Sequence, residues 1–381
     1  MKTNRKKICV VATIPYAINM FMKPHIKMLS KQYDITLISN GNEYDPSILK
    51  NYNIKFISIG IARKTSLWLD IITLFRIYRI FLKEDFDVVH SLMPKTALLG
   101  MLAAFAAGVP HRIHTFTGQV WANKTGIARL GLKILDKLVA KCATRLLTDS
   151  ASQRQFLIGQ DIVKNEKISV LGNGSVCGVD TERFRPNPLV RDQIRTNLNI
   201  KKTDLVYLFL GRLNKDKGIQ DLAYAFSELA GNMPNAHLLV VGPDEGGMDL
   251  ILQSILSNHL TQFHRIGFTD KPEDYIACAD IFCLPSYREG FGSVLIEAAS
   301  AGVPAIASRI YGITDAVVDG ETGILHQPNN IEEIKQALLT LSNETDLRVK
   351  MSQQATIRAH ALFATDIVVA AMHKYYKNLL Y

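Results

Sequence analysis

The sequence predicts an α/β protein made of two doubly wound, Rossmann-like domains that face each other across a cleft. Its 381 residues suit two domains of ordinary size. Short apolar runs rich in β-branched residues alternate with longer segments of helical period, which is typical of a parallel sheet covered on both faces. This alternation stops once, at a polar passage, and then restarts. Because ligands bind beyond the carboxyl ends of strands in such sheets, we expect a cleft between two such domains.

The first half contains six predicted strands. The basic residues before Ile8 resemble the start of a signal peptide, but the apolar run lasts only seven residues before Pro15, so we interpret it as a buried strand. The longest apolar stretch, residues 97–109, is shorter than the roughly 20 residues of a membrane-spanning helix, and we expect none. The predicted strands of this half are residues 8–11, 35–38, 55–59, 88–90, 112–115 and 168–171.

A proline-containing passage, from Phe184 to about Thr203, is the best candidate for a domain boundary. The strand and helix alternation resumes after it, which predicts a second doubly wound domain. The predicted strands of this second half are residues 205–210, 237–241, 264–266, 281–284 and 304–307.

The strongest signal for chemistry is the loop of residues 285–297, which follows a predicted strand and leads into a helical run. Gly290 and Gly292 permit a tight loop with exposed backbone N–H groups, and the helix N-terminus adds a positive end suited to phosphate. Glu289 before the helix and Glu297 within it could each hold sugar hydroxyls. The alternative is an ordinary strand-to-helix turn with two solvated glutamates.

A second signal, residues 210–218, also follows a strand directly. Arg212 and Lys217 at the mouth of a sheet would clamp a diphosphate, each charge-assisted contact contributing ~1.5–3 kcal/mol. Either residue could instead be an ordinary surface cation. Gly242 and Phe268 end or follow two further strands of this half and would lie along the same rim.

In these elements, the chain resembles the family 4 glycosyltransferases, retaining enzymes of the GT-B fold, over nearly its whole length. Both loops, the Ala-Gly-Val-Pro at 301–304 and the stretch 319–325 occur in that family's order and spacing. The resemblance implies that Arg212 and Lys217 hold the donor diphosphate, that Glu297 binds the ribose hydroxyls and that Glu289 binds the transferred sugar. The donor-binding residues implied are Gly211, Arg212, Lys217, Gly242, Phe268, Ser286, Glu289, Gly290, Phe291, Gly292, Ser293 and Glu297.

The same resemblance implies a division of labour along the chain. Residues 1–185 would form the acceptor-binding domain and residues 186–362 the donor-binding domain. Residues 363–381 would form a C-terminal helix that packs back on the first domain.

The N-terminal half resembles a narrower subgroup that builds bacterial surface polysaccharides such as O-antigen and capsule, through residues 90–95, 114–121 and 172–175. It departs from the broad family at Thr117, where many members have a histidine, while His114 lies three residues earlier. Both are candidates for a catalytic role, and a buried structural histidine is the alternative for His114. The expected acceptor-side residues are Tyr16, Lys95, Gln119 and Asn173.

Charge is unevenly distributed. Residues 1–190 carry 27 Lys and Arg against 13 Asp and Glu, a net charge of +14, whereas residues 191–381 carry 17 against 22, a net charge of −5. Two helical stretches, 66–83 and 124–145, mix cations with apolar residues; we expect most of the apolar residues in the core and the cations on one face. Such a face would attract anionic lipid by about 1 kcal/mol per cation. Together with the subgroup resemblance, this favours a polyprenyl-diphosphate-linked saccharide as acceptor, at the cytoplasmic face of the inner membrane.

We predict no metal and no cofactor besides the donor substrate. The chain has one Asp-x-Asp motif, Asp85-Phe86-Asp87, which we interpret as the polar start of a buried strand rather than as a manganese site. The five cysteines are odd in number and scattered, without a C-x-x-C pair, which favours a reducing cytosol.

The sequence therefore predicts a retaining, UDP-sugar-dependent hexosyltransferase of the EC 2.4 class that acts in surface polysaccharide biosynthesis. Three alternatives remain. A nucleotide-sugar epimerase of the same fold would consume donor without acceptor. A non-catalytic sugar-nucleotide binding subunit would not need both Glu289 and Glu297. A nucleic-acid-binding protein would use the basic half, which contains no recognisable nucleic-acid-binding module, so we expect no nucleic acid partner.

Overall fold

In the computed structural model, which describes residues 5–41, 52, 54–61 and 66–381, the chain divides into two compact units. Unit 1 comprises Met1–Cys177 together with Thr365–Tyr381, and unit 2 comprises Gly178–Ala364. The sequence analysis placed the corresponding boundaries at 185 and 362.

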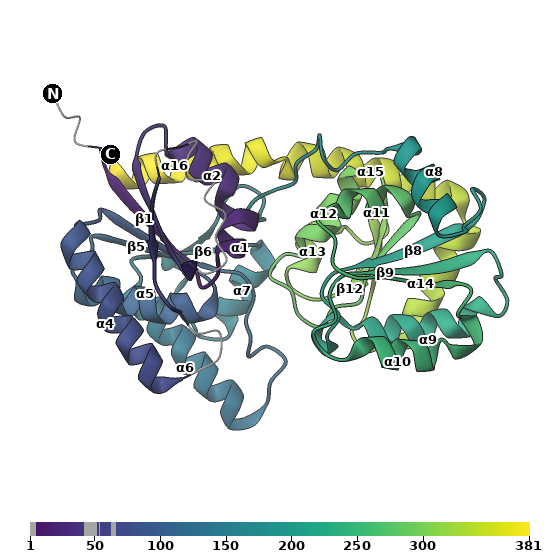
Figure 1. Cartoon of the computed structure of the whole chain (residues 1–381), viewed down its shortest axis with the longest axis horizontal. Helices are drawn as coiled ribbons and strands as arrows, with labels where there is room; N and C mark the ends of the chain where they lie inside the picture. The colour runs from purple at the N-terminus through teal and green to yellow at the C-terminus, as the bar shows by residue number, and fades with distance from the viewer. Residues whose placement is uncertain (1–4, 42–51, 53, 62–65) are drawn as a thin grey trace. The chain divides into compact units, whose positions relative to one another are not determined.

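Unit 1 is built on a parallel seven-stranded sheet in the order β3-β2-β1-β4-β5-β6-β7 (Figure 1). Its strands are β1 (Lys7–Val11), β2 (Asp34–Ser39), β3 (Lys55–Ser58), β4 (Val88–Leu92), β5 (His111–Phe116), β6 (Arg145–Thr148) and β7 (Ile168–Val170). Its helices are α1 (Pro15–Ala17), the π-helix η1 (Ile18–Met22), α2 (Lys23–Leu29), α4 (Leu67–Glu84), α5 (Pro94–Ala106), α6 (Gly126–Cys142), α7 (Ala151–Gly159), the 3₁₀ turn η3 (Asn165–Lys167) and α16 (Thr365–Leu380).

Helices cover both faces of this sheet. Helix α5 packs against both α4 and α6 on one face, and α16 packs against α2 on the other (Figure 1). The C-terminal helix is fixed to the sheet by Tyr376, whose buried hydroxyl lies 2.7 Å from Nδ1 of His90 in β4. Unit 1 is therefore doubly wound, as the sequence predicts.

Unit 2 contains a parallel six-stranded sheet in the order β10-β9-β8-β11-β12-β13. Its strands are β8 (Leu205–Leu210), β9 (Ala236–Val241), β10 (Phe263–Ile266), β11 (Ile281–Leu284), β12 (Ala305–Ser308) and β13 (Gly323–His326). Its helices are α8 (Pro188–Asn197), the 3₁₀ turn η4 (Lys215–Lys217), α9 (Ile219–Ala230), α10 (Met248–Ile255), the 3₁₀ turn η5 (Ser257–His259), α11 (Pro272–Cys278), α12 (Ser293–Ser300), α13 (Ile313–Ala316), α14 (Ile331–Asn343) and α15 (Thr345–Phe363).

The central strands of unit 2 explain why the sequence signal was clear there. Strand β9 is buried along its whole length, and β8 along all but its last residue, so both read as continuous apolar runs. Helix α9 packs against both α10 and α14, and α12 packs against α15 (Figure 1). The prediction of a second doubly wound domain is confirmed.

The prediction that most apolar residues of the two basic helices lie in the core is wrong. In α4, Thr73, Ile77 and Phe81 form the buried stripe, while many of its large apolar residues face outward. In α6 only the last turn is buried. The cause is that both helices carry apolar residues on two faces, and a parallel sheet covers only one of them.

Both aspartates of the Asp-x-Asp motif have structural roles: Asp85 ends a helix and Asp87 accepts hydrogen bonds from neighbouring residues. Asp85 has a positive φ of 53° and ends α4. Asp87 accepts hydrogen bonds from the Lys6 ammonium at 2.8 Å and from the Lys7 backbone N–H at 2.9 Å. These contacts agree with the interpretation of the motif as the start of a strand, since β4 begins at Val88.

Candidate active site

The candidate donor site lies at the carboxyl edge of the unit 2 sheet, where β8 and β11 are neighbours. The chain leaves β8 towards β9 on one side and leaves β11 towards β12 on the other. Loops diverge at such a switch point, and ligands bind there in doubly wound sheets. The two loops are residues 211–218 and residues 285–292, the same two that carry the sequence signals.

Glycines allow these loops to approach each other closely. Gly218 has a φ of +64°, and a Cβ built on it would lie 2.0 Å from the Pro285 carbonyl oxygen. A backbone hydrogen bond of 2.8 Å, from the Tyr287 N–H to the Asp216 carbonyl, joins the same loops. Gly242 has a φ of +137°, and its Cβ would lie 1.9 Å from the Gly211 carbonyl oxygen. No side chain fits at either position, so the glycines set the spacing of the rim.

Three of the predicted side chains meet across the two loops. The Lys217 ammonium lies 2.5 Å from Oε1 of Glu289, and the Ser286 hydroxyl donates to the same oxygen at 2.9 Å. Lys217 and Glu289 are both largely buried. A cation and a carboxylate at this spacing can bind a diphosphate oxygen and a sugar hydroxyl next to each other.

Arg212 has a different partner. Its Nη1 lies 2.9 Å from Oε2 of Glu245, which follows β9, and both side chains are exposed to solvent. The two cations of the predicted diphosphate clamp are therefore each paired with a carboxylate of the chain.

Helix α12 begins beside these side chains, as the sequence predicts. Gly292 precedes it with a φ of +76°, and the helix starts at Ser293. Phe291 is buried, and its ring packs edge-to-face on Phe363 at 5.2 Å between centroids. The buried ring holds the backbone of Gly290, Phe291 and Gly292 beside the N-terminus of α12, and the positive end of this helix favours an anion.

Glu297 lies in α12 and is partly buried. Burial raises the pKa of Glu297 to about 7; Arg183 opposes this rise in pKa and Glu273 adds to it. Arg183 and Glu273 form an ion pair of 2.7 Å. The Glu297 carboxyl therefore changes between its protonated and its ionised form near neutral pH.

Phe268 follows β10 and Gly267, and its side chain is exposed. A ring at this rim is suited to stacking on a base. The sequence analysis placed Phe268 on the rim because it follows a strand, without assigning it this role. The structure thus places every predicted donor residue at the carboxyl edge of β8, β9, β10 or β11, or on α12.

Sequence reasoning missed the partners of the site residues. Besides Glu245, the Tyr287 hydroxyl donates to Asp221 at 2.7 Å and Arg288 pairs with Asp216 at 3.1 Å. Each pair joins the β11 loop to the β8 loop or to α9. Acidic residues at 216 and 221 next to a cation-rich loop were the signal that could have indicated these pairs.

The predicted acceptor-side residues lie at the carboxyl edge of the unit 1 sheet. Tyr16 follows β1 and is exposed, and Asn173 is exposed in the turn after β7. Lys95 follows β4 and pairs with Asp70 of α4 at 2.7 Å.

Gln119 follows β5, is buried, and accepts a hydrogen bond from Gln153 at 3.2 Å. Thr117 lies between β5 and Gln119 and is half-buried.

His114 is a buried residue within β5. Its Nδ1 lies 3.0 Å from the Ser91 hydroxyl, and its ring packs edge-to-face on Phe116 at 4.5 Å. Burial lowers the pKa of His114 to about 4, so the ring is neutral at physiological pH. A neutral, hydrogen-bonded ring suits the structural reading of this histidine.

Asp149 is a candidate that the sequence analysis did not name. It follows β6 at the same edge, is almost completely buried, and its Oδ1 has no hydrogen-bond partner. Burial raises the pKa of Asp149 well above its usual range. Its signal in the sequence was the polar triplet Thr148-Asp149-Ser150, after a strand that was itself missed.

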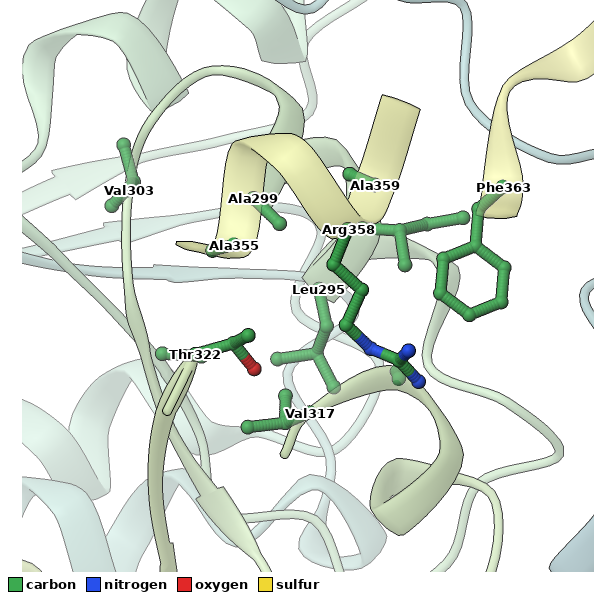
Figure 2. A pocket seen from close by; sticks show the side chains of 12 residues that line it. Leu295, Ala299, Val303, Val317, Thr322, Ala355, Arg358, Ala359 and Phe363 are labelled. Carbon is green, nitrogen blue, oxygen red and sulfur yellow. The ribbon is translucent and has the colours of Figure 1, made fainter. Parts of the chain in front are cut away.

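Two cavities of unit 2 lie elsewhere. Figure 2 shows Arg358 among apolar side chains of α12 and α15; this cavity has a volume of about 10 Å³, room for about one water molecule. The Arg358 Nη2 donates to the Asp315 carbonyl at 2.7 Å. A larger cavity of about 370 Å³ adjoins Asp280 and Pro304, which precede β11 and β12, so it lies at the opposite edge of the sheet from the donor loops.

Comparison with known proteins identifies the family. The model of the glycosyl transferase 4-like domain matches residues 28–174, and that of the glycosyl transferases group 1 matches residues 190–358. The chain is 30% identical to the capsular polysaccharide biosynthesis glycosyltransferase CapM of Staphylococcus aureus, over 98% of both chains. It is 29% identical to the UDP-Gal:alpha-D-GlcNAc-diphosphoundecaprenol alpha-1,3-galactosyltransferase of Escherichia coli, over 84% of this chain and 83% of the relative.

Solved structures support the same fold. Sucrose-phosphate synthase from Thermosynechococcus elongatus superimposes with a TM-score of 0.82 at 18% identity, covering 98% of this chain and 99% of that one. HepE from Anabaena, in complex with UDP and glucose, superimposes with a TM-score of 0.82 at 15% identity, covering 98% and 100%. With the fold of glycosyltransferases and two family models matched in order along it, the chain belongs to the group 1, family 4-like glycosyltransferases of GT-B fold.

Proposed function

We propose that this glycosyltransferase moves a hexose or N-acetylhexosamine from a UDP-sugar to a polyprenyl-diphosphate-linked saccharide, with retention of configuration at the anomeric carbon. The observation that carries the donor half is the meeting of Lys217, Ser286 and Glu289 on neighbouring loops, beside the N-terminus of α12. The HepE structure with UDP and glucose supports a UDP-linked donor by its similarity.

The proposed chemistry is driven by the departing diphosphate. The bond from the anomeric carbon to the phosphate oxygen breaks, the acceptor hydroxyl oxygen bonds to that carbon on the same face, and the acceptor proton passes to a phosphate oxygen. Negative charge accumulates on the diphosphate, so Arg212, Lys217 and the α12 N-terminus would stabilise the transition state more than the ground state. Glu289 would orient the sugar and Glu297 the ribose, and no side chain need form a covalent intermediate.

This role for the cations underlies the proposal that transfer is metal-independent. Two side-chain cations and a helix N-terminus can supply the positive charge that a divalent ion supplies in other transferases. We therefore expect full activity in EDTA and no cofactor besides the donor.

The acceptor half of the proposal has two supports. The Escherichia coli relative is named for an acceptor linked to diphosphoundecaprenol, and the Staphylococcus aureus relative is named for capsule synthesis. The first 190 residues carry a net charge of +14, which suits a diphosphate-bearing lipid in an anionic membrane. No helix among the described residues is long and apolar enough to cross a bilayer, so we propose peripheral association with the cytoplasmic face of the inner membrane.

A donor and acceptor panel tests the proposal. Purified protein is incubated with several UDP- and GDP-sugars, with and without a polyprenyl-diphosphate-linked saccharide, in buffer containing EDTA. Release of UDP that depends on acceptor, with a lipid product heavier by one sugar and an α-configured linkage from an α-donor, is the expected result. Conversion of the donor sugar without acceptor would favour an epimerase, and tight donor binding without turnover for any pair would favour a non-catalytic subunit.

The Arg212→Ala, Lys217→Ala double variant tests the clamp. We expect transfer to be lost while the variant keeps the circular dichroism spectrum of the folded wild type. Its thermal unfolding temperature should fall, because removing Lys217 leaves the largely buried Glu289 carboxylate without its cation, whereas the Arg212 pair is exposed. Lys335→Ala is the matched control, since this lysine also pairs with acids of unit 2, Glu228 and Glu332, but lies on α14. Full activity of the double variant would exclude the clamp.

A further inference from the structure

Two helices of unit 1 expose large apolar side chains together with cations. We call the outward sides of α4 and α6 the α4–α6 face. On α4 the apolar residues are Trp68, Ile71, Phe75 and Leu82, and on α6 they are Ile127, Leu130 and Ile134. The exposed cations of this face are Arg76, Arg79, Lys83, Lys137 and Lys141.

On α4 the exposed apolar residues recur at intervals of three, four and seven positions, so they form one stripe. The buried stripe of Thr73, Ile77 and Phe81 lies on the opposite side of the helix. Arg79 is part of the outward stripe, and its guanidinium lies 6.0 Å from the centroid of the Phe75 ring. The outward side of α4 therefore combines aromatic rings with guanidinium groups.

Helix α6 repeats the pattern. Its outward side carries Ile127, Leu130 and Ile134, again three and four positions apart, and Lys137 and Lys141 continue the same side. The buried side includes Val139 and Ala140.

The acids of the two helices do not offset these cations. Asp70 pairs with Lys95 at 2.7 Å and Glu84 pairs with Lys55 at 2.5 Å. Asp136 accepts a hydrogen bond of 2.7 Å from the indole of Trp121. Since α4 and α6 contain only these three acids, their outward sides present positive charge alone.

The two outward sides belong to one layer and begin near the expected acceptor edge. Both helices pack against α5, on the same face of the sheet (Figure 1). Helix α4 ends just before β4 begins and α6 follows β5, so both helices start towards the carboxyl ends of the strands. Exposure is greatest at these starts: 80% for Leu67, 73% for Trp68 and 90% for Ile127.

We propose that the α4–α6 face is a docking surface for an anionic lipid bilayer, with the helix starts inserted among the headgroups. Aromatic and aliphatic side chains ringed by cations, with the acids of α4 and α6 held in contacts of their own, have the composition of an interfacial membrane-binding surface. A second copy of the chain is a poorer occupant, because pairing this face with itself would bring two sets of like charges together. The inference rests on the proposed function, since a lipid-linked acceptor brings the carboxyl edge of unit 1 to a bilayer.

Vesicle co-sedimentation tests the surface. The full chain is mixed with vesicles of phosphatidylcholine containing 30% phosphatidylglycerol, or of phosphatidylcholine alone, without donor or acceptor. We expect binding to the anionic vesicles that weakens in high salt. Removing three cations (R76Q, R79Q, K83Q) should weaken it by about 100-fold, at about fivefold per cation near the surface. Absence of wild-type binding at low salt would overturn the proposal.

Two matched double variants distinguish binding through the α4–α6 face from non-specific binding through any exposed apolar residue. W68S with I127S removes two of its exposed apolar side chains, and we expect binding to fall at least tenfold. L189S with L250S removes two comparably exposed residues from unit 2, 84% and 78% accessible, and should bind as the wild type does. Equal loss in both double variants, or loss in neither, would contradict the assignment.

Trp68 supplies a direct reporter. The chain has two tryptophans, and Trp121 is buried beneath α6 residues, so only Trp68 can meet lipid. Brominated phosphatidylglycerol vesicles should quench about half of the fluorescence of the wild type and none of that of W68F. An unquenched wild type that sediments would place the lipid contact on another face, and a dimer that W68S with I127S turns into a monomer would identify a second copy as the occupant.

Failure of docking is distinguishable from failure of the proposed function. A short-chain, water-soluble analogue of the acceptor is assayed in parallel without vesicles. Transfer to this analogue by a protein that binds no vesicles would retain the function and reject the docking surface. Vesicle binding without transfer to any acceptor would retain the docking surface and reject the proposed function.

Discussion

The two cations assigned to the donor diphosphate are held by carboxylates of the chain itself. Lys217 pairs with Glu289 and Arg212 with Glu245. A diphosphate must compete with Glu289 for Lys217 and with Glu245 for Arg212, and the two ion pairs differ in stability. The Arg212 pair is exposed, and exposed pairs contribute about 0–1 kcal/mol, whereas the Lys217 pair is largely buried and also hydrogen-bonded to Ser286.

Glu245→Gln should therefore lower the KM for the donor. Removing the carboxylate frees Arg212 for the diphosphate, and the gain is limited to about fivefold because an exposed pair contributes at most about 1 kcal/mol. Steady-state kinetics against donor concentration measure this change in KM, with Glu228→Gln, which removes the exposed partner of Lys335, as control. A higher KM in the Glu245 variant would mean instead that this carboxylate positions Arg212 for the donor.

The KM for the donor should also depend on pH through Glu297. Burial raises the pKa of Glu297 to about 7, so its carboxylate is lost as the pH falls through 7. A carboxylate accepts hydrogen bonds from ribose hydroxyls better than a carboxylic acid does, so KM should rise severalfold between pH 8 and pH 6. Glu297→Gln, which cannot ionise, should show a higher KM that is flat over this range. A wild-type KM independent of pH would remove Glu297 from the ribose site.

Residue types at the donor site could be predicted from the sequence, but their partners could not. Arg212, Lys217, Glu289 and Glu297 stand in loops directly after strands or in the following helix, and local spacing is enough to locate them. The pairing of Lys217 with Glu289 depends on β8 lying beside β11, and these strands are 70 residues apart in the chain with two other strands between them. Such a neighbour relation comes from sheet topology, which no local pattern encodes.

At the scale of elements, the donor site depends on how closely the β8 loop approaches the β11 loop. Gly218→Ala should lower kcat/KM at least tenfold, because its Cβ would lie 2.0 Å from the Pro285 carbonyl oxygen and would force the loop carrying Lys217 away from the loop carrying Glu289. The same variant also places alanine at a positive φ, which costs about 1 kcal/mol in itself.

Gly320→Ala separates these two effects. Gly320 has a φ of +77°, and a Cβ there would have no atom within 4 Å, so this variant carries the backbone strain without the collision. We expect similar losses of unfolding free energy from strain, but wild-type kcat/KM in the Gly320 variant. Equal activity in the two variants would show that the loop spacing does not matter to transfer.

Most central strands were predictable because a parallel sheet buries them on both faces, so they are continuous apolar runs. The two strands that were missed, β6 and β13, are mostly buried too, but only two residues of each are apolar: Leu146 and Leu147 in β6, and Ile324 and Leu325 in β13. The outward faces of α4 and α6 were predicted as core because helical periodicity reports that apolar residues share a side, not what that side contacts. An outward apolar side and a buried one have the same periodicity in the sequence, and only the position of the sheet shows which side is buried.

For the whole molecule, both units bury histidines in the neutral form. Burial lowers the pKa of His90 to about 3 and of His114 to about 4 in unit 1, and that of His264 to about 4 in unit 2, where the nearby His237 lowers it further. In the unfolded chain these rings titrate near pH 6.5. Between pH 6.5 and pH 4 these histidines therefore bind more protons in the unfolded chain than in the folded one, and their contribution to stability falls as the pH falls. The carboxyls of Glu297 and Asp149, whose pKa is raised by burial, contribute in the opposite direction.

We expect each of the fully buried His90 and His114 to lower the free energy of unfolding by about 1 kcal/mol between pH 6.5 and pH 5.5, and the partly buried His264 to lower it by less. Urea unfolding followed by circular dichroism at several pH values measures this slope. His114→Asn should make the slope shallower even where it lowers stability overall, because one proton-binding ring is removed from the unfolded state. His373→Asn, which replaces a histidine that contacts Gln32 at the surface, is the matched control. A slope that His114→Asn leaves unchanged would mean that the folded chain protonates this histidine, which its hydrogen bond to Ser91 argues against.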